Sequence, residues 1–229
     1  MKTISRLAIA LLLVAGLAAP SSAGLVAGVI PGGSGVNNFI LNGTLGGSAL
    51  GSSIGGWYGA QLYLGGASDI EVEWFGGEAG FLNEFHWTGV LPSPLYKHPG
   101  GVYINLDGSK KDSDTITGVA PGLLPFSFFV PDGALSVANG LNPDNSGLGP
   151  NFFVTFSLTT TTLGGPTSGN SVWIFFDDGG AQNDDNHDDM AIRLTAKDGD
   201  FTVVPEPGSM LLLGSGLAAL GMRRRRRQR

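Results

Sequence analysis

An acidic segment at residues 177–189 has the residue types and spacing of a cation-binding loop. Six carboxylates fall within its thirteen positions, together with glycines that permit sharp turns. Hard cations such as Ca²⁺ bind six to eight oxygen atoms from carboxylates, amides and carbonyls. Asp184, Asn186 and Asp188 stand at alternate positions, a spacing that lets their side chains converge on one ion. We therefore expect Ca²⁺ to be held by Asp178, Asp184, Asn186 and Asp189, with Asp177 and Asp188 as alternates.

The segment does not follow the EF-hand pattern, although its first positions suggest it. Counted from Asp184, the sixth position is Asp189 where glycine is required, and the twelfth is Thr195 where glutamate is required. A helix–loop–helix calcium site is therefore excluded. Two alternatives to a calcium loop stay open: a solvated acidic turn between strands, and a catalytic use of the carboxylates.

The same segment resembles the acidic loop of calcium-associated β-sandwich modules of bacterial surface proteins, the DUF4114-like group. In that group a Phe-Glu-Asp stretch, a short glycine loop and Asp-x-Asp-Tyr-Asn-Asp lead into the next strand. Residues 176–178 and 184–189 are similar to these two parts. Asn186, His187 and Asp188 depart from the pattern, standing where Asp, Tyr and Asn are usual. The resemblance implies a calcium-stabilised β-sandwich.

The chain contains few other residues that could carry out enzyme catalysis. There is no cysteine nucleophile, no G-x-S-x-G elbow and no P-loop. Glu71 and Glu73 could form the carboxylate pair of a glycosidase, but they also fit the polar face of a strand. His86 is interpreted as a strand residue and His98 as a surface residue. His187 could bind a transition metal beside the carboxylates, but a lone imidazole among oxygens is more often a turn residue. We expect a protein that is not an enzyme.

Short strands must position the acidic loop, because the apolar residues of the body alternate with period two. Residues 69–74, 102–106, 152–159 and 190–195 show this alternation, whereas residues 172–176 are apolar on both faces and predict a central strand. Turn signals such as Asp107-Gly108 separate the runs. The pattern predicts an all-β fold, an antiparallel β-sandwich or jelly roll.

The composition agrees with a single β domain. Glycine supplies 38 of 229 residues, and no uninterrupted stretch of the body has a helical apolar period. About 180 residues are enough for one domain with a sizeable core. We place this domain at residues 24–204. Its first part, residues 24–55, is rich in Gly, Ser and Asn and is expected to form an edge strand or two, or a loosely ordered arm.

The N-terminus has the three regions of a secretory signal peptide. Lys2 and Arg6 precede an apolar run at residues 7–19, and small residues at 21–23 form the cleavage site. Residues 1–23 are therefore expected to be removed on export. Because the chain has no cysteine, its stability outside the cytoplasm must come from the core or from a bound ion.

The C-terminus, residues 205–229, has three parts of different physical character. Pro205-Glu206-Pro207 forbids a continuous helix and favours an extended, accessible backbone. Residues 209–222 carry no charge and, as a helix, would span about 21 Å, less than the roughly 30 Å hydrocarbon core. A basic cluster at residues 223–229 follows, and its five consecutive arginines resist translocation: Arg223, Arg224, Arg225, Arg226 and Arg227.

This order of parts resembles the PEP-CTERM sorting signal of exported bacterial proteins. The resemblance implies that the export machinery and an exosortase-type membrane protease are partners of the chain. It also implies a transient anchor in the inner membrane, followed by release to the cell surface or an extracellular polysaccharide matrix. An anchor that is never cut remains the alternative.

Removing both termini exposes a strongly acidic body. Residues 24–204 keep five basic and 18 acidic side chains, a net charge of −13. Such a body repels nucleic acid phosphates, so no nucleic acid partner is expected. We expect an exported structural or interaction protein of the cell surface or matrix. The alternatives are a carbohydrate-binding module, for which Trp57, Tyr58, Trp74 and Trp87 are the candidate aromatics, and a secreted glycan-active enzyme.

Overall fold

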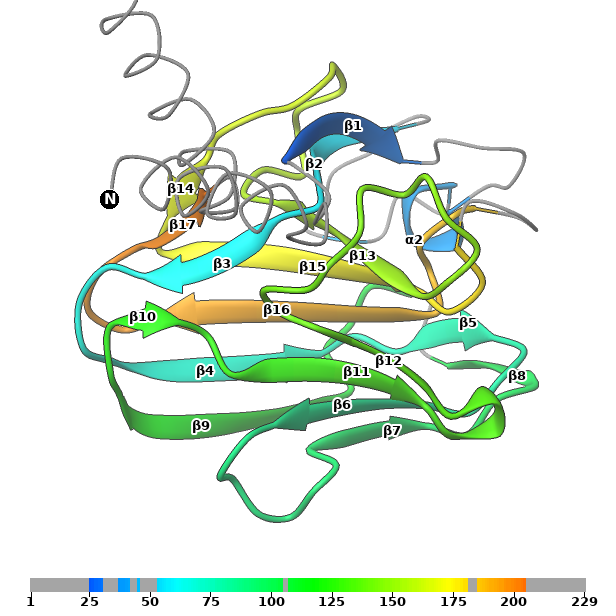
Figure 1. The fold of residues 1–229 in the computed structure, drawn as a ribbon, viewed down its shortest axis with the longest axis horizontal. Helices are drawn as coiled ribbons and strands as arrows, with labels where there is room; N and C mark the ends of the chain where they lie inside the picture. Colours follow the sequence, from blue (N-terminus) through cyan, green and yellow to red (C-terminus); the bar gives the residue numbers. More distant parts are fainter. Residues whose placement is uncertain are drawn as a thin grey trace, which may run out of the picture.

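The computed structural model describes residues 25–30, 37–41, 45, 53–104, 107–180 and 185–204. Antiparallel strands make up most of this part of the chain and run side by side in Figure 1. The predicted signal peptide and the whole C-terminal tail lie outside the described residues. Within these ranges no helix is both long and apolar enough to cross a membrane.

A seven-stranded sheet forms the centre of the fold, in the order β1-β2-β13-β15-β16-β4-β9. Every neighbouring pair in it is antiparallel. Its strands are β1 (Val26–Ile30), β2 (Ile54–Tyr58), β13 (Asn151–Thr155), β15 (Ser171–Asp177), β16 (Met190–Ala196), β4 (Ser68–Trp74) and β9 (Asp112–Val119).

Three smaller sheets accompany the central one. Two four-stranded sheets have the orders β10-β3-β17-β14 and β12-β11-β6-β7, and β5 pairs with β8 in a two-stranded ribbon. Their strands are β3 (Gln61–Leu64), β5 (Gly77–Ala79), β6 (Asn83–Trp87), β7 (Tyr96–His98), β8 (Val102–Ile104), β10 (Gly122–Leu123), β11 (Phe126–Val130), β12 (Leu135–Ala138), β14 (Ser168–Gly169) and β17 (Phe201–Val204). A short helix α2 (Asn38–Leu41) and a 3-10 turn η2 (Pro131–Gly133) complete the described elements.

The main core lies between one face of the central sheet and the two four-stranded sheets. Apolar residues at alternate positions of β13, β15, β16 and β4 pack against those of β3, β17, β6 and β11. Phe176 of β15 stacks on Phe128 of β11 with ring centroids 4.4 Å apart and planes 4° apart. This packing of antiparallel sheets confirms the predicted all-β sandwich.

The opposite face of the central sheet carries a second, smaller apolar cluster. Phe153, Trp173 and Phe175 from β13 and β15 contribute to it, together with Ile30 of β1 and Phe39 of α2. Because β15 buries side chains on both faces, it is a central strand, as its continuous apolar run predicted. The N-terminal residues that the structure describes therefore contribute to this second cluster.

Strand β4 buries an acidic side chain that its alternating pattern placed on a polar face. Glu73 is 3% exposed and accepts two hydrogen bonds from Arg193, at 2.5 and 2.8 Å. The Arg193 guanidinium lies over the rings of Phe75 and Trp173, 5.3 and 5.2 Å from their centroids. The predicted alternation is correct, but the Glu73 carboxylate faces the Arg193 guanidinium rather than water.

The ribbon β5–β8 differs from its prediction in another way. Residues 102–106 were expected to alternate as β4 does; Val102 is 45% exposed, whereas Ile104 on the same face is partly buried against the main core. Strand β8 pairs with β5 in a two-stranded ribbon at the end of the sandwich, so only part of its apolar face packs on the core (Figure 1). Alternation alone does not reveal whether another layer lies over a strand.

Candidate functional site

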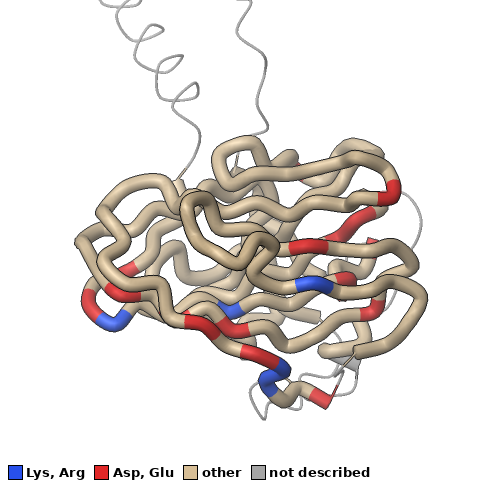
Figure 2. Tube along the Cα trace, turned by 90° about the horizontal axis from the view of Figure 1, so that it is seen from below, with Lys and Arg blue, Asp and Glu red and all other residues tan. Residues whose placement is uncertain are grey.

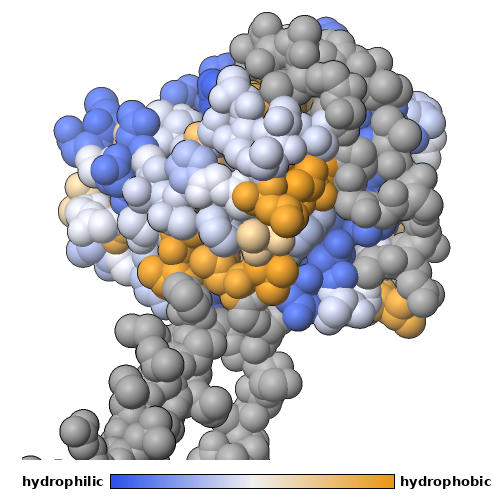
Figure 3. Space-filling view, turned by 90° about the horizontal axis from the view of Figure 1, so that it is seen from above, coloured by the Kyte–Doolittle hydropathy of each residue, from blue (hydrophilic) through white to orange (hydrophobic). Residues whose placement is uncertain are grey.

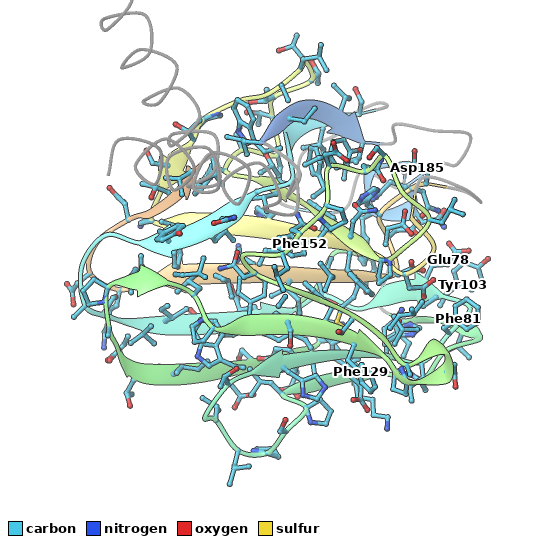
Figure 4. All side chains as sticks on the ribbon, viewed as in Figure 1. Glu78, Phe81, Tyr103, Phe129, Phe152 and Asp185 are labelled. Atoms are coloured by element: carbon cyan, nitrogen blue, oxygen red, sulfur yellow. The ribbon has the colours of Figure 1, made fainter. Side chains whose placement is uncertain are left out.

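The acidic segment forms the connection between β15 and β16 at one end of the sandwich, where Figure 4 labels Asp185. Phe176 pairs with Met190 at the last rung of the two strands, and the Asp189 amide donates to the Phe176 carbonyl at 3.2 Å. Residues 177–180 leave the sheet and residues 185–189 return to it, so their side chains meet at the strand ends. Figure 2 shows that acidic positions outnumber basic ones over this molecule.

Asp177, the last residue of β15, presents one carboxylate oxygen to the turn and one to the interior. Its Oδ1 accepts hydrogen bonds from the Gly179 and Gly180 amides at 2.7 and 2.8 Å, as aspartates at turns commonly do. Its Oδ2 is buried and has no hydrogen-bond donor among the described residues. Burial raises the pKa of Asp177 to about 7, the charges of Asp185 and Asp178 add to the effect, and the two amide bonds oppose it.

Two residues of the returning segment adopt the left-handed backbone conformation. Asp185 has φ 47° and His187 has φ 57°, a region that aspartate and histidine enter more readily than branched residues. The turn buries the His187 side chain completely. Burial lowers the pKa of His187 to about 3, so the imidazole is neutral at physiological pH.

Asp177, Asp185 and His187 bring three ligand atoms together. His187 Nδ1 lies 3.8 Å from Asp177 Oδ2 and 3.7 Å from Asp185 Oδ1, and all three atoms lie within 4.8 Å of one another. Among the described residues, these three side chains are the group of acidic and histidine side chains placed closely enough to hold one metal ion. The Tyr58 ring lies 5.3 Å from the His187 ring, and burial together with the charges of Asp185 and Asp177 raises the pKa of Tyr58.

The residues predicted to bind calcium have other partners in the structure. Asp178 Oδ2 accepts from Asn83 at 2.8 Å, and Asp189 Oδ2 accepts from the Asp178 amide at 2.7 Å. Asp188 Oδ2 accepts from the Asn38 amide at 2.8 Å.

The Asn186 backbone carbonyl accepts from the Asn37 side chain at 2.8 Å. Asp184 lies outside the described residues. The calcium set stays a prediction, and the three-ligand group includes Asp177, one of its alternates.

Sequence reasoning considered His187 as a transition-metal ligand beside carboxylates but favoured a turn residue, and it did not name Asp185 as a ligand. The available signal was the Asp185-x-His187 spacing in a segment that also holds Asp177. That signal is weak, because a lone imidazole among carboxylates is common in solvated turns. The burial of His187 is what distinguishes this site from a solvated turn.

A second polar array lies on β6 and the loop after it. His86 Nδ1 is 2.9 Å from Ser93 Oγ, and His86 Nε2 is 3.0 Å from Glu84 Oε2, beside an open hollow of about 600 Å³. These are the residue types of a serine triad, but the two ring nitrogens have exchanged partners relative to it. Lys97 also pairs with Glu84, at 3.2 Å, so the carboxylate is shared.

Glu73 and Glu71, the other carboxylate pair, do not resemble a proton-donating pair. Burial would raise the pKa of Glu73, but the hydrogen bonds and charges of Arg193 and Lys110 outweigh it and lower the pKa. A general acid of a glycosidase needs the opposite shift. The candidate carbohydrate-stacking aromatics are in the core in three of four cases: Tyr58, Trp74 and Trp87 are at most 7% exposed.

The comparisons with known proteins concern the other end of the chain. The family model of the PEP-CTERM protein-sorting motif matches residues 203–227. No curated protein and no solved structure matches the chain. The motif contains Pro205-Glu206-Pro207 and the five arginines from Arg223 to Arg227, as the sequence predicted. This chain therefore carries a PEP-CTERM protein-sorting motif, the mark of an exported protein that is anchored transiently in the membrane and processed by an exosortase.

Proposed function

We propose that this chain is a structural or interaction protein of the bacterial cell surface or extracellular matrix, released from its membrane anchor by cleavage near Pro205-Glu206-Pro207. The sorting motif at residues 203–227 carries the proposal, because it implies export and processing. A β-sandwich with a stable two-sided core and a net charge of −13 over residues 24–204 suits a passive role outside the cell.

Exposed apolar side chains support an interaction role. Leu141, Leu148 and Leu163 are 65–75% exposed. Figure 3 shows hydrophobic side chains gathered into patches on an otherwise mostly hydrophilic or neutral face. Contiguous exposed apolar surface commonly marks contact sites for other macromolecules. The proposal contains no catalytic step.

Processing should remove the tail in cells that have the protease. We expect mass spectrometry of the surface-associated protein to find no peptide from Met210 onward. Replacing Pro205, Glu206 and Pro207 with alanine should leave the chain in the membrane fraction with its tail intact, because a helix can then continue through the recognition segment. Ser209→Ala, just beyond the motif, is the matched control and should be processed normally.

An intact C-terminus ending in Arg229 on the mature wild-type protein would contradict this expectation. So would normal release of the triple-alanine variant.

One observation favours carbohydrate binding as a second candidate function. Tyr103 and Phe81 are 69% and 49% exposed beside the β5–β8 ribbon, and Glu78 and Tyr103 line a hollow of about 220 Å³ there. Glu78 and Tyr103 are paired across the ribbon, and Figure 4 labels both at this end of the sandwich. An exposed ring beside a carboxylate offers both stacking and hydrogen bonding to a sugar.

If the ribbon binds glycan, Tyr103→Ala should reduce retention of the protein on the exopolysaccharide of its host at least tenfold. Tyr63→Ala, a half-buried tyrosine in β3, should leave retention unchanged. Wild-type protein that passes through the same column unretarded would leave the purely structural role as the better explanation.

A further inference from the structure

Three hydrogen-bond acceptors face one another in the interior beside the β15–β16 connection. They are Asp177 Oδ2, Asp185 Oδ1 and His187 Nδ1. The side chain of His187 is 0% exposed and Asp177 is 2% exposed, so little water reaches the atoms between them. Neither Asp177 Oδ2 nor His187 Nδ1 has a hydrogen-bond partner among the described residues.

A chain of hydrogen bonds fixes which nitrogen of His187 carries the proton. Asn145 Nδ2 lies 2.9 Å from Asp185 Oδ1, and a carboxylate can only accept, so Asn145 presents its amide group to Asp185. The oxygen of Asn145 then accepts from Asn151 Nδ2 at 2.9 Å. The oxygen of Asn151 is left to accept from His187 Nε2 at 2.7 Å. His187 therefore holds its proton on Nε2, which leaves Nδ1 unprotonated 3.8 Å from Asp177 Oδ2 and 3.7 Å from Asp185 Oδ1.

A positive charge at its centre would stabilise such a cluster. Two carboxylate oxygens and an imidazole lone pair repel one another in a medium from which water is excluded. The separations of 3.7 and 3.8 Å are shorter than two metal–ligand bonds of about 2.0–2.2 Å laid end to end, so one ion can bind His187 and either carboxylate. The Asn151 bond to Nε2 is the outer contact that metal-bound histidines commonly make.

The donor set selects the class of metal. Calcium takes oxygen ligands, whereas one imidazole nitrogen with two carboxylates suits first-row divalent metals such as Zn²⁺. The surroundings also favour a fixed site. The Tyr58 ring lies 5.3 Å from the His187 ring, and the Asn37 side chain donates to the Asn186 and His187 carbonyls at 2.8 and 3.2 Å. The loop is thus held from two sides.

We propose that Asp177, Asp185 and His187 form a binding site for a divalent transition metal of the zinc type, with Asn151 as the residue that positions His187. The ion ties the end of β15 to the start of β16 and replaces mutual repulsion with attraction. This site shares only Asp177, an alternate, with the calcium set predicted for the same segment, and it takes a different class of metal.

The test uses the full chain, purified in mild detergent and stripped with a chelator. Zn²⁺ at a hundredfold excess over its dissociation constant should raise the melting temperature by about 5–10 °C, since it binds the native state alone. Ca²⁺ at the same excess over that constant should produce no shift. Co²⁺ should give a visible absorption band that Zn²⁺ displaces, which reports ligation directly.

Matched variants separate this site from the rest of the loop. Asp177→Asn and Asp185→Asn keep side-chain shape and should each weaken Zn²⁺ binding at least tenfold and abolish the Co²⁺ band. Asp178→Asn removes the same charge one residue away and should change neither. His187→Gln should lose the band, and its metal-free melting temperature shows whether it folds.

The proposal is overturned if Zn²⁺ shifts nothing and Co²⁺ gives no band in wild type. It is also overturned if Asp178→Asn loses binding while Asp177→Asn and Asp185→Asn retain it, because the ion would then sit among other carboxylates. A melting shift with Ca²⁺ and not with Zn²⁺ would overturn the assignment of metal class.

Discussion

Replacing Phe128 with alanine is expected to lower the free energy of unfolding by about 3–5 kcal/mol, the usual cost of truncating a buried phenylalanine. Phe128 is fully buried and stacks on Phe176 across the two main layers, with further ring contacts to Phe85, Phe126 and Phe152. The cavity would lie between sheets that are held apart by their other side chains, so collapse cannot fill it. The melting temperature should fall by about 6–20 °C.

The adjacent residue on β11 provides the control. Phe129 is half-buried on the opposite side of the strand, where its ring contacts His86 rather than the core. Phe129→Ala should cost about 1 kcal/mol, the centre of the range for point substitutions. Equal losses at the two positions, measured by denaturant unfolding, would show that the sheets do not pack through Phe128.

Arg193→Ala should lower the free energy of unfolding by about 3 kcal/mol at neutral pH. It leaves Glu73, 3% exposed, without its bidentate partner, and breaking a buried pair from one side is expensive. The loss of unfolding free energy stays near the low end of the range for a broken buried ion pair, because Lys110 Nζ remains 3.3 Å from Glu73 Oε1. Arg193→Ala also removes the guanidinium from the faces of Phe75 and Trp173.

The pH dependence gives this prediction a second readout. The pKa of Glu73 is lowered in the folded protein, so its stabilisation is present above the ordinary carboxyl pKa and is lost as pH falls through the lowered value. The difference in unfolding free energy between wild type and Arg193→Ala should therefore become smaller as the pH falls from neutral to about pH 3. Lys197→Ala is the control: its pair with Asp69 is 3.8 Å long and 74% exposed at the lysine, so we expect less than about 1 kcal/mol at any pH. A gap that does not narrow in acid would show that Arg193 acts by packing alone.

Much of the fold could be predicted because strand formation is a local property. Ile70, Val72 and Trp74 alternate with polar residues and bury one face of β4, and the apolar run of β15 lies at the centre of the large sheet. The sorting motif could be recognised for a related reason. Its proline-flanked glutamate, apolar stretch and arginines act through their order along the chain, and no tertiary contact is needed to define them.

The sequence by itself determined the β-sandwich class, the acidic body and the sorting motif. Only the tertiary structure decided that Glu73 meets Arg193, 120 residues away, and that Val102 of β8 stays 45% exposed. It also decided that Asn151 fixes the proton of His187 from a strand 36 residues away, which turns the Nδ1 lone pair toward Asp177 and Asp185. Alternation and spacing describe neighbours along the chain, whereas burial and ligand geometry depend on which distant segments pack together. The physical reason is that desolvation acts on a side chain only when another layer excludes water from it.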